Sequence, residues 1–85
     1  MTSTTPAPHP GAIIRERLSR EKMTLIQGAK ATGFSKAGFE NVIYGRTGVT
    51  ARMAIRLAEL FDGGPSAQDW LKAQAAYDLE QEAGK

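Results

Sequence analysis

Residues 24–45, TLIQGAKATGFSKAGFENVIYG, decide the fold. They contain two short segments with helical spacing of apolar residues, divided by Gly33 and Phe34. Thr24 and Ser35 each precede one segment and have the side-chain oxygen that caps a helix N-terminus. Gly33 adopts a positive φ at no steric cost, so the chain can reverse direction there. Two short helices joined by a tight glycine turn are the layout of a helix-turn-helix.

The rest of the chain is also predicted to be helical, because it shows neither alternating apolar residues nor a hairpin signal. We expect one helix before the motif and two after it, which gives an all-α bundle of five helices. The expected helices are residues 11–20, 24–33, 36–44, 50–61 and 66–82. Ser66 followed by Asp69 resembles a capping box and supports the start of the last helix.

The first ten residues, MTSTTPAPHP, differ in composition from the rest of the chain. Three prolines within five residues oppose helix and predict a flexible tail over residues 1–10, although Pro10 can also occupy the first turn of a helix. His9 lies between two of these prolines and is expected to be an unconstrained tail residue. The chain of 85 residues has room for one core, so residues 11–82 are expected to form a single domain.

The residue inventory argues against several classes of function. The chain contains no cysteine and a single histidine, which excludes disulfides, thiolate metal sites and multi-histidine metal sites. A Ser–His–Asp triad would need an ordered His9, and the glycines do not form a phosphate-binding loop. We therefore expect no enzyme, no cofactor and no metal. No apolar run approaches the roughly 20 residues that cross a bilayer, and no signal peptide is visible, so we expect a cytoplasmic protein.

The net charge of +2 conceals an uneven distribution. Nine basic and three acidic residues between Arg15 and Arg56 give this segment a charge of +6. Two basic and six acidic residues between Leu57 and Lys85 give −4. A basic segment of this kind indicates a face that binds a polyanion, although ordinary solvated helix surfaces also have mixed charge.

The second helix of a helix-turn-helix lies in the major groove and presents the residues near its N-terminus to the bases. Its exposed side chains here are expected to include Lys36, which can reach a guanine edge or a phosphate, and Asn41, which can pair with adenine. Residues that follow this helix are expected to contact phosphates. The residues expected to contact DNA are Thr24, Ser35, Lys36, Ala37, Glu40, Asn41, Arg46, Thr47 and Arg52.

Longer stretches of the chain resemble a known family. Residues 29–35 (AKATGFS) and 42–50 (VIYGRTGVT) resemble the Xre/Cro-type helix-turn-helix proteins. More narrowly, residues 9–11 (HPG), 48–58 (GVTARMAIRLA) and 70–79 (WLKAQAAYDL) resemble the HigA-like (VapI) antitoxin branch. The resemblance covers about residues 9–82 and is most specific in the last of these stretches.

This resemblance implies a lambda-repressor-like fold and a role in a type II toxin–antitoxin system. Such antitoxins are cytoplasmic homodimers that repress their own operon by binding a palindromic operator. They also neutralise a small basic toxin (HigB), usually an mRNA-cleaving ribonuclease of the RelE-like fold. The resemblance further implies that subunits pair through the C-terminal helix, about residues 66–82. The residues expected at this interface are Trp70, Leu71, Gln74, Ala75, Asp78 and Leu79.

The chain departs from the family pattern at five positions in the motif. Leu25 replaces a glutamine that contacts phosphate, and Gly28 and Thr32 replace leucines. A glycine inside a helix costs roughly 1 kcal/mol, which predicts a less firmly packed second helix. Gly38 has no side chain to read a base, and Glu40 replaces a serine with a carboxylate that phosphates repel unless it accepts from cytosine. Two alternatives therefore remain open, a toxin-sequestering module with weak DNA readout and a stand-alone Xre-type repressor.

Overall fold

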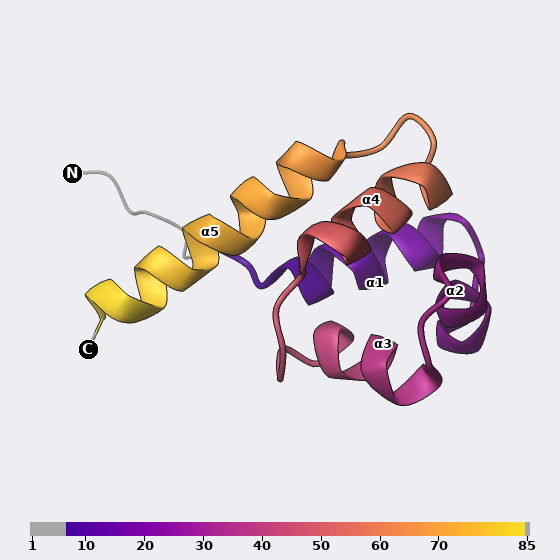
Figure 1. Cartoon of the computed structure of the whole chain (residues 1–85), viewed down its shortest axis with the longest axis horizontal. Coiled ribbons are helices and arrows are strands. Elements are labelled where there is room, and N and C mark those ends of the chain that lie inside the picture. Colours follow the sequence, from indigo (N-terminus) through magenta and orange to yellow (C-terminus); the bar gives the residue numbers. More distant parts are fainter. Residues whose placement is uncertain (1–6, 85) are drawn as a thin grey trace.

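A computed structural model describes residues 7–84, which form five α-helices and no β-strand within that range (Figure 1). The helices are α1 (Pro10–Arg20), α2 (Leu25–Thr32), α3 (Lys36–Ile43), α4 (Ala51–Leu60) and α5 (Ala67–Ala83). The prediction of a five-helix all-α fold is confirmed, and every helix boundary lies within one residue of the expected one. The four shorter helices surround the core, whereas α5 extends beyond them (Figure 1).

The start of α1 is fixed by residues that the sequence placed in the tail. The Nδ1 atom of His9 accepts a hydrogen bond of 2.9 Å from the backbone N–H of Gly11, so His9 caps the helix. The His9 ring also lies edge-on to the ring of Tyr77 on α5, with 4.7 Å between the centroids. The expectation that His9 is an unconstrained tail residue is therefore wrong, because two contacts hold its ring. Residues 1–6 of the expected tail lie outside the described residues.

Three local interactions produce the helix-turn-helix. The hydroxyl of Thr24 accepts from the N–H of Gln27, and the side-chain oxygen of Gln27 accepts from the N–H of Thr24, so a capping box starts α2. Gly33 ends α2 with a φ of +79°, a conformation that favours glycine. The hydroxyl of Ser35 accepts from the N–H of Gly38 at 3.0 Å and caps α3. The structure thereby confirms the predicted capping roles of Thr24 and Ser35 and the predicted turn at Gly33.

Gly28 lies at the place where α2 packs against both α1 and α3. A Cβ atom at Gly28 would come within 2.9 Å of the Leu18 side chain and 3.1 Å of the Phe39 ring. The buried Thr32 hydroxyl donates to the carbonyl of Gly28 at 2.9 Å, which satisfies this polar group inside the core. The expected looser packing of this helix is not found, because the glycine permits a closer approach of three helices.

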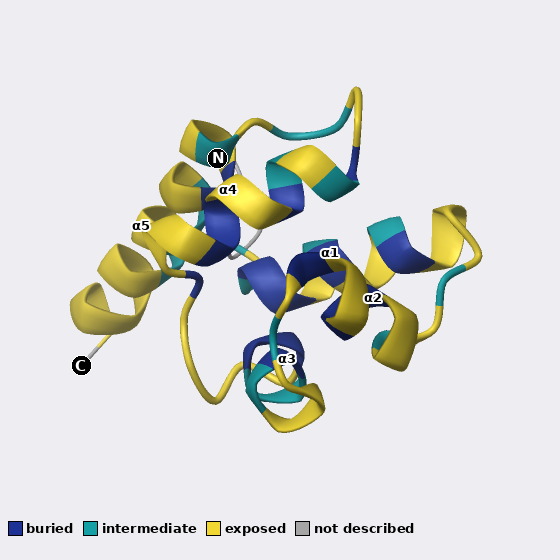
Figure 2. Ribbon diagram, turned by 45° about the vertical axis from the view of Figure 1, so that its right-hand side comes forward, coloured by how far each residue is buried: buried dark blue, intermediate teal, exposed yellow. Residues whose placement is uncertain are grey.

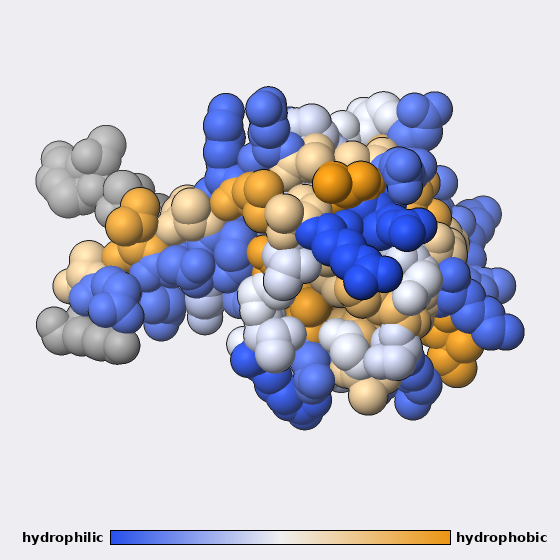
Figure 3. Space-filling view, in the orientation of Figure 1, coloured by the Kyte–Doolittle hydropathy of each residue, from blue (hydrophilic) through white to orange (hydrophobic). Residues whose placement is uncertain are grey.

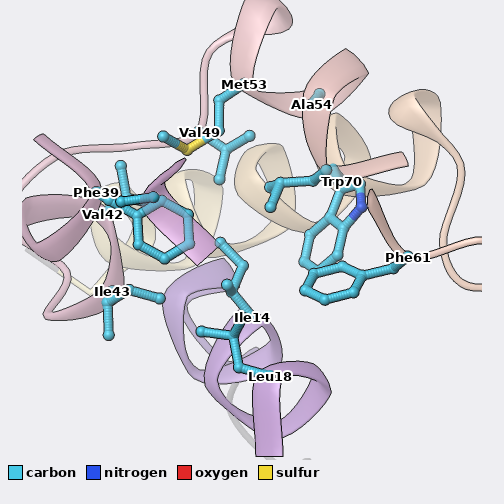
Figure 4. Packing of buried hydrophobic residues seen from close by; sticks show 12 residues of the cluster. Ile14, Leu18, Phe39, Val42, Ile43, Val49, Met53, Ala54, Phe61 and Trp70 are labelled. Atoms are coloured by element: carbon cyan, nitrogen blue, oxygen red, sulfur yellow. The ribbon is translucent and has the colours of Figure 1, made fainter. Parts of the chain in front are cut away.

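One hydrophobic core joins the five helices (Figure 4). The stripe predicted on α3, Phe39 with Val42 and Ile43, is buried in it. The rings of Phe61 and Trp70 pack together at the other end, with 6.3 Å between their centroids. The buried hydrophobic residues are Ile14, Leu18, Ala29, Phe39, Val42, Ile43, Val49, Met53, Ala54, Leu57, Phe61 and Trp70.

The last helix, α5, begins with the capping box that the sequence predicted. The carboxylate of Asp69 accepts from the N–H of Ser66, and the hydroxyl of Ser66 accepts from the N–H of Asp69, both at 3.1 Å. The backbone hydrogen bond from Ser66, together with the Ser66 side chain, holds the pKa of Asp69 below its ordinary value. This cap stabilises the negative charge near the positive end of the helix dipole.

Beyond its first turn, α5 contributes little to the core (Figure 2). Trp70 is its one buried residue, and the outer half of the helix is exposed. Contacts with other segments still hold α5 in place, because Gln74 accepts from the N–H of Val49 at 2.8 Å and Glu80 accepts from the N–H of Ala7 at 2.9 Å. These contacts orient a long helix whose outer half is solvent-exposed in the described structure.

Candidate nucleic-acid interface

The outward face of α3 presents the residues predicted to read DNA bases. Because the apolar residues of α3 fill the core, its polar residues are directed outward. Lys36 and Ala37 are exposed, while Glu40 and Asn41 are partly exposed. The hydroxyl of Ser35 is engaged in capping the same helix, at the end where the N–H dipoles favour a phosphate.

An ion pair on this face brings together two of the predicted residues. The Nζ atom of Lys36 lies 3.4 Å from Oε2 of Glu40, one helical turn away. An exposed pair of this kind adds little to stability, but the two charges largely cancel. The carboxylate that the sequence predicted to repel phosphates is therefore neutralised within α3. Net positive charge on this side of the molecule therefore comes from the segments that flank α3.

Three further predicted residues, Asn41, Arg46 and Thr47, lie close together at the end of α3 and in the turn that follows it. The main-chain carbonyl of Asn41 accepts from the N–H groups of Arg46 at 2.8 Å and Thr47 at 3.2 Å. The Arg46 guanidinium also donates to Oδ1 of Asn41 at 3.4 Å. The Arg46 guanidinium thus contacts the side-chain amide of Asn41 through its oxygen, and the Nδ2 donor of this amide has no partner among residues 7–84. The arrangement leaves that donor available to a base edge.

Thr24 and Arg52 lie on the helices that flank α3. Thr24 caps α2 and is exposed, and Arg52 is exposed in the first turn of α4. Within residues 7–84, neither makes a hydrogen bond or an ion pair with the predicted residues of α3. All nine residues predicted to contact DNA therefore lie at the surface. Among them, Lys36 forms an ion pair with Glu40, and Arg46 forms a hydrogen bond with Asn41. Their contact with DNA remains a prediction.

Two residues beside this surface were missed from the sequence. Tyr44 follows α3 and is 52% exposed. The Cζ atoms of Arg46 and Arg15 lie 5.5 Å and 5.9 Å from the centroid of its ring. Tyr44 is two residues from Arg46 in the sequence, and this spacing only weakly predicts a contact between the two side chains. The proximity of Arg15 depends on how α1 packs on α3, and no local pattern predicts it.

The second predicted surface, on α5, has an exposed apolar stripe (Figure 3). Leu71 and Leu79 are 37% and 71% exposed, and Ala75 between them is exposed as well. Residues four apart share one face of a helix, so these three form a continuous line. Trp70 is only 1% exposed and fills the core, so its expected place at a subunit interface is corrected.

The polar residues predicted on α5 have partners within the chain. The Nε2 atom of Gln74 donates to Oδ1 of Asp78 at 2.9 Å, while its Oε1 atom accepts from the N–H of Val49 at 2.8 Å. Gln74 thus ties α5 to the loop before α4. Asp78 remains exposed, and the interface assignment of both residues remains a prediction.

Several known proteins resemble the chain in sequence and structure, although no protein-family profile matches it. Virulence-associated protein I of Dichelobacter nodosus is 40% identical over 76 residues, which cover 88% of this chain and 68% of the relative. An addiction module antidote protein of the HigA family from Coxiella burnetii superposes with a TM-score of 0.85 and 32% identity, over 94% of this chain and 86% of that one. The chain belongs to the HigA-like (VapI) family of helix-turn-helix proteins.

A second HigA structure extends the comparison. The Pseudomonas aeruginosa antitoxin HigA, solved with the higBA promoter, has a TM-score of 0.84 and 33% identity, over 92% of this chain and 84% of that one. Virulence-associated protein A′ of Dichelobacter nodosus is a further relative. The match to this HigA-like chain spans 64% of the length of protein A′ and 68% of the length of protein I. No helix within the described part of the chain is long and apolar enough to cross a membrane.

Proposed function

We propose that this HigA-like chain is a dimeric antitoxin that binds operator DNA in its own promoter and represses its operon. The proposal includes neutralisation of a small basic toxin of the RelE-like, mRNA-cleaving type. It rests mainly on the likeness to P. aeruginosa HigA, which was solved with promoter DNA. The chain would act by binding and not by catalysis, without a cofactor, in the cytoplasm where operator DNA and mRNA are present.

In this proposal α3 enters the major groove of the operator. A groove of B-DNA about 12 Å wide admits one α-helix, and the residues near its N-terminus meet the base edges. Lys36 and Ala37 would lie there, with Glu40 and Asn41 one turn further along. The free Nδ2 donor of Asn41 suits the N7 atom of adenine, and its oxygen suits the amino group.

Phosphate contacts would come from the residues around α3. Ser35 lies at the N-terminus of α3, while Arg46 and Thr47 lie in the turn after it. Thr24 and Arg52 lie at the starts of α2 and α4, where helix dipoles favour anions. These contacts set the register of the protein on the duplex without reading its sequence.

The exposed stripe of Leu71, Ala75 and Leu79 supports pairing of two copies through α5. Burying apolar surface stabilises association by about 25 cal/mol per Å². A two-fold dimer of this kind would present two α3 helices to successive major grooves, about 34 Å apart. The operator should therefore be a palindrome.

A mobility-shift titration with the promoter DNA of the gene tests DNA binding. The chain should shift this DNA at low salt, and the affinity should fall steeply as the salt concentration rises. Lys36→Ala combined with Asn41→Ala should weaken binding by at least about 30-fold, since each of the two base contacts contributes about 1–3 kcal/mol and about 1.4 kcal/mol is tenfold. Arg20→Ala, which removes a charge paired with Glu16 on α1, is the matched control. A folded protein that shifts no promoter DNA at low salt would contradict the proposal.

One observation favours a second candidate, a toxin-sequestering module with weak DNA readout. The Lys36–Glu40 pair leaves the α3 face nearly neutral, and Leu25 stands where a phosphate-binding residue was expected. Co-expression with the adjacent open reading frame, followed by co-purification, tests the toxin claim. Co-purification together with unchanged operator affinity in the double variant would support the second candidate. Absence of a neighbouring toxin gene would instead favour a stand-alone repressor.

A further inference from the structure

An exposed tyrosine at the end of α3 holds two arginines from different segments. Tyr44 is 52% exposed, and the Cζ atoms of Arg46 and Arg15 lie 5.5 Å and 5.9 Å from its ring centroid. Both distances fall within the roughly 6 Å at which a guanidinium is attracted to an aromatic ring. The Tyr44 ring therefore has two positive groups within reach, one from α1 and one from the turn after α3.

Neither of these two arginines has an ion-pair partner among residues 7–84. The carboxylates closest to them in sequence are engaged elsewhere, since Glu16 pairs with Arg20 at 2.9 Å and Glu40 pairs with Lys36 at 3.4 Å. The Arg46 guanidinium bonds only to a neutral amide oxygen within the described chain. Two uncompensated cations at one ring attract an anion.

The cluster adjoins the predicted DNA surface. A shallow pocket beside Tyr44 is formed by α1, the turn before α2 and the first residue of α2. It is lined by Arg15, Leu18, Ser19, Met23, Leu25 and Tyr44. Thr24, which caps α2, precedes the lining residue Leu25, and Arg46 contacts the Tyr44 ring. The pocket is thus lined by a residue that follows Thr24 in the sequence and by the ring that Arg46 contacts.

We infer that Arg15 and Tyr44, together with Arg46, bind one phosphate of the DNA backbone beside the groove that α3 enters. The inference rests on the proposed function and adds two residues to the nine predicted contacts. Guanidinium groups match phosphate oxygens in bidentate geometry, and attraction to the Tyr44 ring would keep both groups near it. Continuity with Arg46 favours DNA over an acidic protein as the source of the anion. A phosphate contact adds affinity without preference for sequence.

Arg15→Gln tests the site on the full chain. Binding is measured on a promoter duplex and on an unrelated duplex of equal length, over a salt range of about 50–200 mM. We expect both affinities to fall by about 5- to 10-fold and the salt slope to decrease by about 1. Arg20→Gln is the matched control, because it removes the same charge from α1 about 140° around the helix. Far-UV circular dichroism checks that each variant is folded.

The outcomes separate this inference from the proposed function. If Arg15→Gln binds both duplexes with the affinity and salt slope of the wild type, the phosphate site is overturned. Promoter binding by the wild type would still support the proposed function. Loss on the promoter duplex alone would also overturn it, because a phosphate contact acts on any sequence. Failure of the wild-type chain to bind either duplex would overturn both proposals. Should Arg15→Gln fail to fold, Arg15→Lys should keep the salt slope and lose about 2-fold in affinity.

The positioning role of Tyr44 is tested by a double-mutant cycle. Tyr44→Leu removes the ring and should weaken binding of both duplexes about 3-fold. In the Arg15→Gln variant, Tyr44→Leu should reduce the DNA affinity by a smaller factor, because the Arg15 guanidinium that the ring positions is already absent. Additive effects of Tyr44→Leu and Arg15→Gln would contradict the positioning role.

Discussion

Three consecutive residues start α1, and each has a separate physical role. His9 caps the helix, and Pro10 occupies its first position, where no N–H is needed. Gly11 meets the end of α3, because a Cβ atom there would lie 2.5 Å from the carbonyl oxygen of Ile43 and closer still to that of Val42. Only glycine permits this approach of a helix N-terminus to the carbonyls of another helix. Residues 9–11 (HPG) therefore form a packing motif in this chain.

Gly28 has a comparable role inside α2, and we predict that Gly28→Ala destabilises the fold. Alanine gains about 1 kcal/mol in helix propensity, but overpacking against Leu18 and Phe39 costs about 1–3 kcal/mol. We expect a net loss of about 1 kcal/mol in the free energy of unfolding, measured by urea denaturation. The control Ala31→Gly, at an exposed position of α2, should lose about 0.5–1 kcal/mol through propensity alone. Increased stability of Gly28→Ala would refute the close packing described for this helix.

At the scale of the element, α3 combines a buried apolar stripe with an outer face whose charges cancel. The Lys36–Glu40 pair reduces its attraction for phosphates, while Asn41 keeps a free donor for a base. If such a helix enters the groove, it contributes more to the sequence selectivity of DNA binding than to the affinity. In the proposed complex, the affinity for DNA would then depend on arginines supplied by α1, α4 and the turn after α3.

Glu40→Gln tests this division of roles in α3. Removing the carboxylate frees the charge of Lys36 and ends a repulsion from phosphates, so binding of unrelated DNA should tighten by about 3-fold. The ratio of promoter affinity to unrelated-DNA affinity should fall, because Glu40 no longer discriminates among bases. Fluorescence anisotropy with both duplexes measures this ratio. An unchanged affinity for unrelated DNA would show that Glu40 lies away from the phosphates.

The N-terminal cap of α5 makes a pH-dependent contribution to stability. Hydrogen bonds from Ser66 hold the pKa of Asp69 below its ordinary value of 3.8 in the folded chain. The stabilisation is therefore complete above pH about 4 and is lost as the pH falls through the lower, folded-state pKa. We predict that Asp69→Asn is less stable than the wild type at neutral pH and that the difference shrinks as the pH falls below the ordinary pKa of 3.8. A difference in unfolding free energy that stays constant down to low pH would contradict this account.

Local features of the sequence predicted the elements well, because caps and turns depend on adjacent residues. Thr24, Gly33 and Ser35 fixed the helix-turn-helix without knowledge of the rest of the fold. Contacts between distant segments could not be predicted in this way. The packing of His9 on Tyr77 and of Arg15 on Tyr44 depends on how the helices are arranged in space.

At the scale of the molecule, α5 makes the described chain elongated, with extents of 42 × 24 × 20 Å (Figure 1). Its outer half protrudes from the bundle, and the helix exposes Leu71, Ala75 and Leu79 along one face. The basic segment lies in the bundle, and the acidic segment includes this protruding helix. The proposed DNA-binding surface thus lies on the bundle, whereas the proposed dimer interface lies on α5.

Leu71→Glu combined with Leu79→Glu should prevent pairing through α5. Losing the burial of two leucines and placing like charges against each other should weaken dimerisation by at least about 100-fold. Sedimentation equilibrium measures the change in mass. Gln81→Glu is the control, since it adds a charge on another face of the same helix and should leave the dimer intact. A double variant that remains dimeric would place the interface elsewhere.

Hydroxyl-radical footprinting of the promoter tests the central claim, that a dimer of this chain reads an operator through α3. We predict two protected half-sites on one face of the DNA, related by a palindrome and centred about one helical turn, 10–10.5 bp, apart. Lys36→Ala combined with Asn41→Ala should abolish both protections at the same protein concentration. A single unsymmetrical footprint, or protection by the folded wild type that persists in the double variant, would contradict the account.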